Sequence, residues 1–155
     1  MSLLSYRTAQ VEDLTTLAAF RWDMQIESHP GGSPPMSRET YIATYRAEMR
    51  AEMERDRMRA WIAEADGQPV ACVGLIWWVA TPGIEHPRRL RGHVTNVYTR
   101  PSHRRQGISR RLMELLMEHA RAQGIQRLVL WSSDMGAPLY QSLGFLPSKG
   151  MEIDF

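Results

Sequence analysis

Hydrophobic residues recur at helical spacing twice in the first third of the chain. Residues 11–18 place an apolar face on a helix that we expect to be capped by Thr8 and to end before the Pro- and Gly-rich segment 29–35. Ser37 should start a second helix, whose other face is dense in Arg and Glu. The apolar stripe of that helix consists of Ile42, Tyr45, Met49 and Met53. The pattern predicts two helices joined by a loop.

Shorter apolar runs on either side of these helices predict strands. The first strand covers 3–7, before the helices. The segments 60–65 and 70–79 should form a hairpin around Asp66-Gly67, a dipeptide typical of tight turns. The hairpin implies that these two strands are antiparallel.

A further strand over 91–99 has an irregular pattern. Val94 and Val97 are three residues apart, which breaks the two-residue period of a strand. One extra residue would restore the alternation, so we predict a β-bulge near Thr95-Asn96.

The segment 108–122 has the clearest amphipathic pattern in the chain. It predicts a helix that Gly124 should end. The continuous apolar run 127–131 is typical of a strand buried on both faces. Because a strand–helix–strand unit forms a right-handed crossover, strands 91–99 and 127–131 should be parallel.

The end of the chain predicts one more helix and two more strands. The helix covers 137–143 and stops at Gly144, and the strands lie within 145–155 around a turn at 148–150. The whole order favours an α/β fold (α+β mixed sheet), with one central mixed sheet, helices on both faces and a single domain over 1–155.

Composition narrows the class of protein. The 155 residues are 43% hydrophobic and 23% charged, which is typical of a globular domain with a sizeable core. Cys72 is the only cysteine, so no internal disulfide can form. No apolar run approaches the roughly 20 residues of a membrane helix, and the first residues lack the apolar core of a signal peptide. We expect a cytoplasmic protein without a membrane partner.

Basic residues gather in one stretch although the net charge is only +2. Between His86 and Arg111 there are eight arginines and no acidic residue. Within this stretch a strand, a turn around Gly107 and a helix start follow one another. Unpaired N–H groups at a helix start, the helix dipole and nearby arginines together suit a phosphate group.

Two motifs carry a resemblance to a known family. Arg104-Arg105-Gln106-Gly107-Ile108-Ser109 is similar to an Arg/Gln-x-x-Gly-x-Gly/Ala motif at the start of a long helix, and 97–101 resembles the Leu-Tyr-Val-x-Pro strand before it. The second motif, 138–145, is an aromatic-containing helix that ends in Gly-Phe. In these features the chain resembles the GNAT superfamily of acyl-CoA-dependent N-acetyltransferases. The resemblance implies a GNAT-like fold and transfer of an acetyl group from acetyl-CoA to a primary amine.

The resemblance also implies how acetyl-CoA, as co-substrate, would bind. Backbone N–H groups of 105–110 would bind the pyrophosphate, Gly107 would allow close approach, and strand 97–99 would offer backbone groups to the pantetheine arm. Arg104 or Arg110 would add charge-assisted bonds. Ser109 and Ser133 replace a small Gly/Ala and an Asn of the family. The expected cofactor-binding residues are Val97, Tyr98, Thr99, Arg104, Arg105, Gln106, Gly107, Ile108, Ser109, Arg110 and Ser133.

The same resemblance suggests catalytic residues. Tyr140 would protonate the departing thiolate as general acid, and the Val97 N–H would donate to the thioester oxygen. The general base stays open: His93 has a suitable pKa, and Asn96 could instead position a water. Other candidates are Glu27, His29, Glu85 and His86. The five histidines show no ligand pairing, so we expect no metal.

The amine acceptor remains open among small amines, amino acids, antibiotic amines and protein amines. Its site should lie between the first two helices, their loop and the loop 81–90. Trp22, Trp77 and Trp78 are candidates to line it, although alternation along a strand favours one of the last two in the core. A non-catalytic acyl-CoA sensor is the alternative function, a homodimer is plausible, and nucleic-acid binding lacks a supporting module.

Overall fold

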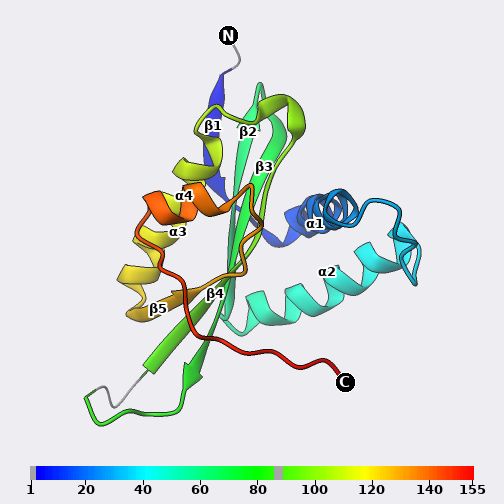
Figure 1. Cartoon of the computed structure of the whole chain (residues 1–155). Coiled ribbons are helices and arrows are strands. Elements are labelled where there is room, and N and C mark those ends of the chain that lie inside the picture. The colour runs from blue at the N-terminus through cyan, green and yellow to red at the C-terminus, as the bar shows by residue number, and fades with distance from the viewer. Residues whose placement is uncertain (1–2, 86–88) are drawn as a thin grey trace.

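Five strands form one sheet in the order β1-β2-β3-β4-β5 in the computed structural model, which describes residues 3–85 and 89–155 (Figure 1). The strands are β1 Leu4–Thr8, β2 Met58–Ala65, β3 Gln68–Ala80, β4 Arg89–Thr99 and β5 Ile125–Val129. The first four run antiparallel to their neighbours, and β5 is parallel to β4. This confirms the mixed sheet, the hairpin and the parallel crossover pair.

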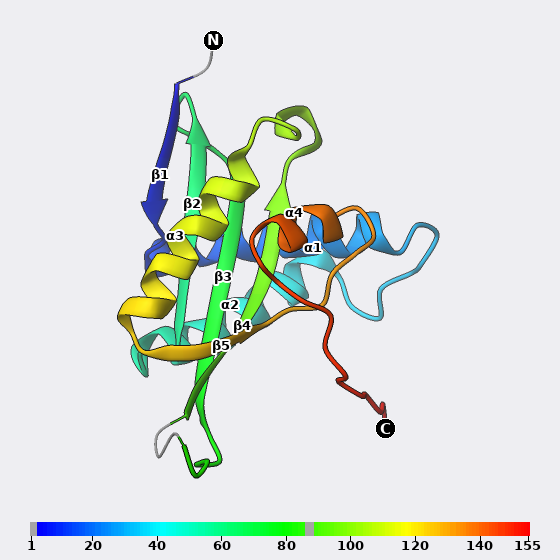
Figure 2. The ribbon, with the colours of Figure 1, turned by 60° about the vertical axis from the view of Figure 1, so that its left-hand side comes forward.

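Helices cover both faces of the sheet, as predicted (Figures 1 and 2). The α-helices are α1 Leu14–Ser28, α2 Arg38–Glu54, α3 Ile108–Ala122 and α4 Ala137–Ser142, and short 3-10 turns cover Val11–Asp13 and Pro101–His103. One core lies between α1 and one face of the sheet, with α2 packed against it, and a second core lies between α3 and the opposite face. The sheet is thus the middle of three layers.

Helix ends follow local signals, with one exception. The Ser37 hydroxyl accepts the Thr40 N–H at 3.2 Å and so caps α2, and α1 ends before the 29–35 segment as predicted. The proposed cap at Thr8 is wrong, because Thr8 pairs with Trp61 in the sheet. A 3-10 turn then leads into α1, and its start is held by the Gln10 N–H, which donates to the Asp13 carboxylate at 2.8 Å.

The predicted bulge is present in β4. Cys72 and Gly74 of β3, two residues apart, face Tyr98 and Thr95 of β4, three residues apart, so β4 carries one extra residue. The bulge includes Asn96, whose φ of +55° lies in the left-handed region. As a result Val94 and Val97 contact the same core, on the α3 side of the sheet.

Two predictions for the last third of the chain are wrong. The strand predicted over 127–131 runs from Ile125 to Val129 and is not buried on both faces, because it lies at the sheet edge and Trp131 is 66% exposed. The segment 145–155 forms no strands; Phe145 packs against the core, and residues 146–155 leave the body as an extended tail (Figure 2). A two-stranded hairpin without a packed face is marginal in water. No helix in the described ranges is long and apolar enough to cross a membrane.

Candidate active site

A large cleft opens where β4 and β5 part. Their pairing ends at His93 and Val129, so the β4 edge from Val94 to Thr99 has no strand beside it on that side. The cleft has a volume of about 1320 Å³ and is lined by α1, β4, the loop that leads into α3, and the segment from Leu130 to Tyr140. It therefore reaches from one face of the sheet to the other.

The cleft brings together nearly all of the residues expected from the sequence. Both catalytic candidates, Tyr140 and His93, line it. So do ten of the expected cofactor-binding residues, namely Val97, Tyr98, Thr99, Arg104, Arg105, Gly107, Ile108, Ser109, Arg110 and Ser133. Gln106 is not among the lining residues; its side-chain amide donates to the Ser102 carbonyl at 3.4 Å.

The loop before α3 has the backbone shape of an anion site. Arg105 and Gly107 have φ of +63° and +77°, and the first helical hydrogen bond of α3 runs from the Arg111 N–H to the Gly107 carbonyl at 3.1 Å. The N–H groups of residues 108–110 therefore have no partner within the helix. Left-handed residues beside residues of ordinary φ turn successive backbone N–H groups toward one concave side, which favours an anion.

Two arginines, one in this loop and one in the first turn of α3, are held by other groups of the protein. Arg104 donates to the Thr99 carbonyl at 2.8 Å and to Glu27 at 2.5 Å, and Arg110 donates to the Ser142 hydroxyl at 2.5 Å. Arg104 thus ties α1 to the loop, while Arg110 ties α3 to α4. Both expected phosphate partners have structural bonds at the cleft wall.

Glu27 is fixed from two sides, which bears on its candidacy as a base. Its carboxylate accepts the Tyr98 hydroxyl at 2.9 Å as well as the Arg104 guanidinium. Burial alone would raise the pKa of Glu27, but these two bonds outweigh it and lower that pKa. Burial, followed by the bond to Glu27, raises the pKa of Tyr98 to about 12. A carboxylate so held is a poor proton acceptor.

The two serines that depart from the family pattern both make bonds within the protein. The Ser109 and Thr99 hydroxyls are 2.8 Å apart and join the end of β4 to the start of α3. The Ser133 hydroxyl accepts the Gly136 N–H at 3.2 Å and so supports the turn that precedes α4. Both side chains shape the cleft wall.

Tyr140 enters the cleft from α4. Its ring packs against Phe145, with centroids 6.0 Å apart, and a Cβ on Gly136 would come within 2.9 Å of its Cε2 atom. Burial raises the pKa of the Tyr140 phenol. The phenol is therefore protonated at neutral pH and has a proton that it can donate.

His93 stands at the fork between β4 and β5. Its ring meets the Trp131 ring edge-on, with centroids 4.6 Å apart. Burial and then the positive charge of Arg21 lower the pKa of His93, so the imidazole is neutral at neutral pH and able to accept a proton.

The other base candidates have different surroundings. Asn96 donates to the Leu17 carbonyl at 3.0 Å, and its Oδ1 atom is buried without a partner among the described residues. Glu85 is exposed in its loop, and His86 lies outside the described residues. His29 lines a different pocket, considered next.

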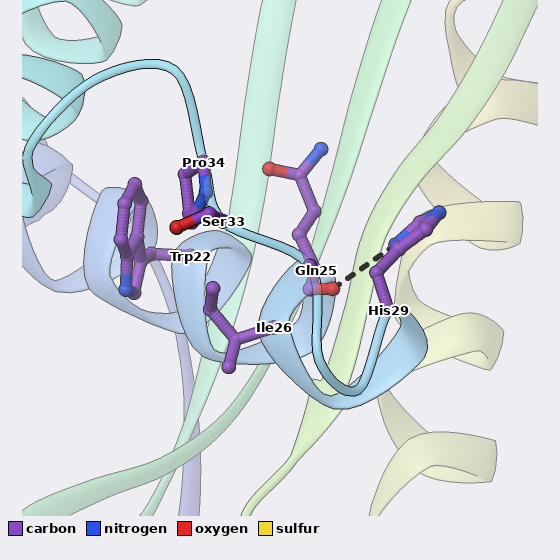
Figure 3. Close-up of a pocket in the computed structure, with 7 residues that line it drawn as sticks. Trp22, Gln25, Ile26, His29, Ser33 and Pro34 are labelled. Carbon is purple, nitrogen blue, oxygen red and sulfur yellow. Dashed lines mark hydrogen bonds between the residues drawn. The ribbon is translucent and has the colours of Figure 1, made fainter.

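A second, smaller pocket lies between α1 and the loop that follows it. It has a volume of about 180 Å³ and is lined by Trp22, Gln25, Ile26, His29, Gly32, Ser33 and Pro34 (Figure 3). Trp22, which we expected near the acceptor, packs on Tyr41 with ring centroids 5.5 Å apart. Trp77 is buried in the core, whereas Trp78 is 43% exposed. The core position of Trp77 agrees with alternation along the strand and excludes it from an acceptor site.

Sequence reasoning missed Arg21, which also lines the large cleft. Its guanidinium donates to the Thr95 hydroxyl at 2.9 Å. A signal was available, because Arg21 continues the helical spacing of Leu14, Leu17 and Ala18, all fully buried. A charge on the buried stripe of a helix needs a polar environment. No group of three or more His, Cys, Asp or Glu in residues 3–85 and 89–155 is placed to hold a metal ion.

Comparisons with known proteins bear on this cleft. A model of the acetyltransferase (GNAT) family matches residues 17–145. A GCN5-related N-acetyltransferase from Ralstonia eutropha JMP134 is 27% identical, with a TM-score of 0.83 and coverage of 99% of each chain. A predicted acetyltransferase from Clostridium acetobutylicum, solved with acetyl-CoA, has the same fold, with 24% identity, a TM-score of 0.87 and coverage of 98% and 96%.

One curated relative matches only in part. A glucosamine 6-phosphate N-acetyltransferase from Trypanosoma brucei brucei is 33% identical over 73 residues, which is 47% of this chain and 50% of the relative. The match thus spans about half the length of each protein.

Proposed function

The chain belongs to the acetyltransferase (GNAT) family, an acetyl-CoA-dependent class of enzyme, and from this we propose that it transfers an acetyl group from acetyl-CoA to a primary amine by direct attack on the thioester. The observation that supports this best is the continuity of the cleft: the open β4 edge, the 105–110 loop and Tyr140 all line it. The amine attacks the carbonyl carbon, the C–N bond forms and the C–S bond breaks.

The cleft residues fit acetyl-CoA by their chemistry. The co-substrate supplies an activated acetyl thioester and carries its phosphates at the other end of a long arm. We assign the N–H groups of 105–110 to the pyrophosphate, because two left-handed residues and a helix start present them together. The open β4 edge at Val97 would bind the arm, and the Val97 N–H would donate to the thioester oxygen.

Tyr140 is the general acid in this proposal. Ordinary pKa values of about 10 for a phenol and 8.5 for a thiol make the proton transfer to a thiolate uphill by only about 2 kcal/mol. Burial raises the pKa of Tyr140, and it would raise the pKa of a thiol in the same cleft as well. The difference between the two groups therefore stays small enough for transfer.

His93 is the general base in this proposal. The attacking amine must lose a proton, and a neutral imidazole at the cleft fork can take it directly or through a water. The lowered pKa of His93 keeps the ring neutral at neutral pH.

An acetyl-CoA turnover assay across classes of amine tests the proposal, with release of free thiol as the readout. Glucosamine 6-phosphate belongs in the panel because the partly matching Trypanosoma relative is named for that acceptor. A sensor without catalysis would bind CoA but release no thiol with any amine.

Tyr140→Phe separates the acid from a packing role. We expect kcat to fall about 10²–10⁴-fold with little change in the KM for acetyl-CoA. Tyr6→Phe, in β1 and outside the cleft, is the matched control and should leave kcat unchanged. An unchanged kcat in Tyr140→Phe, with acetyl transfer shown to limit the rate, would exclude the acid role.

A further inference from the structure

Arg21 is a charged group of the cleft that has no role in the acetyl transfer proposed above. It lies on α1, lines the cleft and bonds to the Thr95 hydroxyl at 2.9 Å. Burial and then the positive charge of Arg21 lower the pKa of His93, so Arg21 lies near the fork where β4 and β5 part. Arg21 is therefore close to the place where we put the reaction.

The charges of the cleft are unequally matched. Within residues 3–85 and 89–155, Glu27 is the only Asp or Glu that lines it, and that carboxylate is bound by Arg104 and Tyr98. Among the residues that the structure describes, no carboxylate lies within salt-bridge distance of Arg21. A half-buried guanidinium whose partners are the neutral hydroxyls of Thr95 and Tyr41 still has free N–H donors, which favours an anion brought by a ligand.

The phosphates of acetyl-CoA are a poor match for this cation by position. Thr95, the partner of Arg21, precedes Thr99 by four residues of β4, which is at most about 13 Å at the rise of a regular strand. The anion-binding loop begins beyond Thr99. Arg21 thus lies at the acyl end of the cleft, where the acceptor amine must arrive.

We propose that Arg21 determines acceptor specificity by binding an anionic group, so that the acceptor is an amine that also carries a carboxylate or a phosphate. The planar guanidinium fork pairs with either group through two parallel N–H bonds. The Thr95 hydroxyl holds the fork in place from the other side. This inference rests on the proposed function, since it names the class of its acceptor.

Matched pairs of acceptors test the inference. Each pair has the same amine with and without the anion: glucosamine 6-phosphate with glucosamine, and tyrosine with tyramine. For the wild-type protein we expect kcat/KM to be about tenfold to a hundredfold higher for the anionic member of at least one pair, the size of one charge-assisted interaction. The pair that shows this difference in kcat/KM indicates whether the protein prefers a phosphate or a carboxylate on the acceptor.

Substitution of Arg21 should remove that gap. Arg21→Gln keeps an N–H donor for Thr95 and should raise the KM of the anionic amine alone, while Arg21→Lys should restore part of the preference. Arg46→Gln, on the exposed face of α2, is the matched control and should keep the gap. Equal kcat/KM within both wild-type pairs, or a gap that survives in Arg21→Gln, would overturn the inference.

Binding measurements separate this inference from the proposed function. Each acceptor is titrated calorimetrically into wild-type and Arg21→Lys protein saturated with CoA. Tighter binding of the anionic amine without any turnover would support the role of Arg21 and contradict the proposed function. Turnover without a preference for the anionic amine would support the proposed function and contradict the role of Arg21. Neither turnover nor a preference in binding would contradict both proposals. The wild-type comparison decides even where Arg21→Gln fails to fold.

Discussion

Replacing Gly107 with Ala tests whether the loop before α3 binds the co-substrate. Gly107 has φ of +77°, and a Cβ built on it meets no atom within 4 Å. The substitution therefore introduces no clash within the protein, only the cost of a left-handed alanine. Gly124, at the other end of α3, has φ of +74° and is equally free of neighbours, so Gly124→Ala is a matched control.

The stability cost should be the same at both positions. A left-handed L-residue costs about 1–2 kcal/mol. The smaller freedom of alanine in the unfolded chain offsets about 0.4–1 kcal/mol of this. A net loss of about 1 kcal/mol should lower the melting temperature of a domain of this size by about 2–4 °C. Thermal unfolding of the two variants checks this expectation.

The functional cost should differ between the two variants. At Gly107 the added methyl group projects from the wall of the cleft, where we place the pyrophosphate. We expect Gly107→Ala to raise the KM for acetyl-CoA about tenfold or more, the equivalent of one lost charge-assisted bond, while Gly124→Ala leaves it unchanged. Equal KM values for two folded variants would refute the assignment of this loop.

Two more predictions concern ionisable groups of the cleft. Burial and then Arg21 lower the pKa of His93, so kcat/KM should fall with decreasing pH only below the ordinary histidine value of about 6.5. His93→Gln should remove this fall at acid pH and lower kcat. A fall at acid pH that persists in the variant would exclude His93 as the base. In Glu27→Gln the pKa of Tyr98 should fall from about 12, as burial remains but the carboxylate is lost. An ultraviolet titration of the tyrosines measures this shift, and an unchanged Tyr98 would contradict the bond to Glu27.

Local sequence signals predicted the parts of the site that short-range rules govern. The helix over 108–122 has the predicted bounds, because a strongly amphipathic segment between two glycines leaves no competing choice. The bulge in β4 followed from the spacing of Val94 and Val97 alone, since both must reach the same core. These two elements place the loop and the open strand edge.

Features that depend on tertiary partners were missed. Residues 151–155 alternate apolar and polar side chains as a strand would, yet no segment of the described chain pairs with them and all five are exposed. The run 127–131 looked doubly buried, but it lies at the sheet edge. The bond between Arg21 and Thr95 joins residues 74 positions apart, so no local pattern could reveal it.

Two positions of strained backbone lie in the wall of the cleft. Four residues other than glycine have positive φ in the described part of the chain, and two of them, Asp56 and Asp66, are at tight turns where Asp tolerates it. The other two, Asn96 and Arg105, line the cleft. Each costs free energy, and the buried unpaired Oδ1 atom of Asn96 adds to that cost.

Bonds from neighbouring elements hold this strain in place. The Asn96 amide donates to the Leu17 carbonyl at 3.0 Å, and the Cys72 thiol donates to the Asn96 carbonyl at 3.2 Å. The left-handed turn at Asn96 lies in the stretch where β4 has no strand beside it on the β5 side, and the one at Arg105 turns N–H groups together before α3. Strain that surrounding structure maintains at two points of one cleft is typical of a functional site. The fold therefore gives up stability at Asn96 and Arg105, the two points of the cleft where we place the thioester and the phosphates.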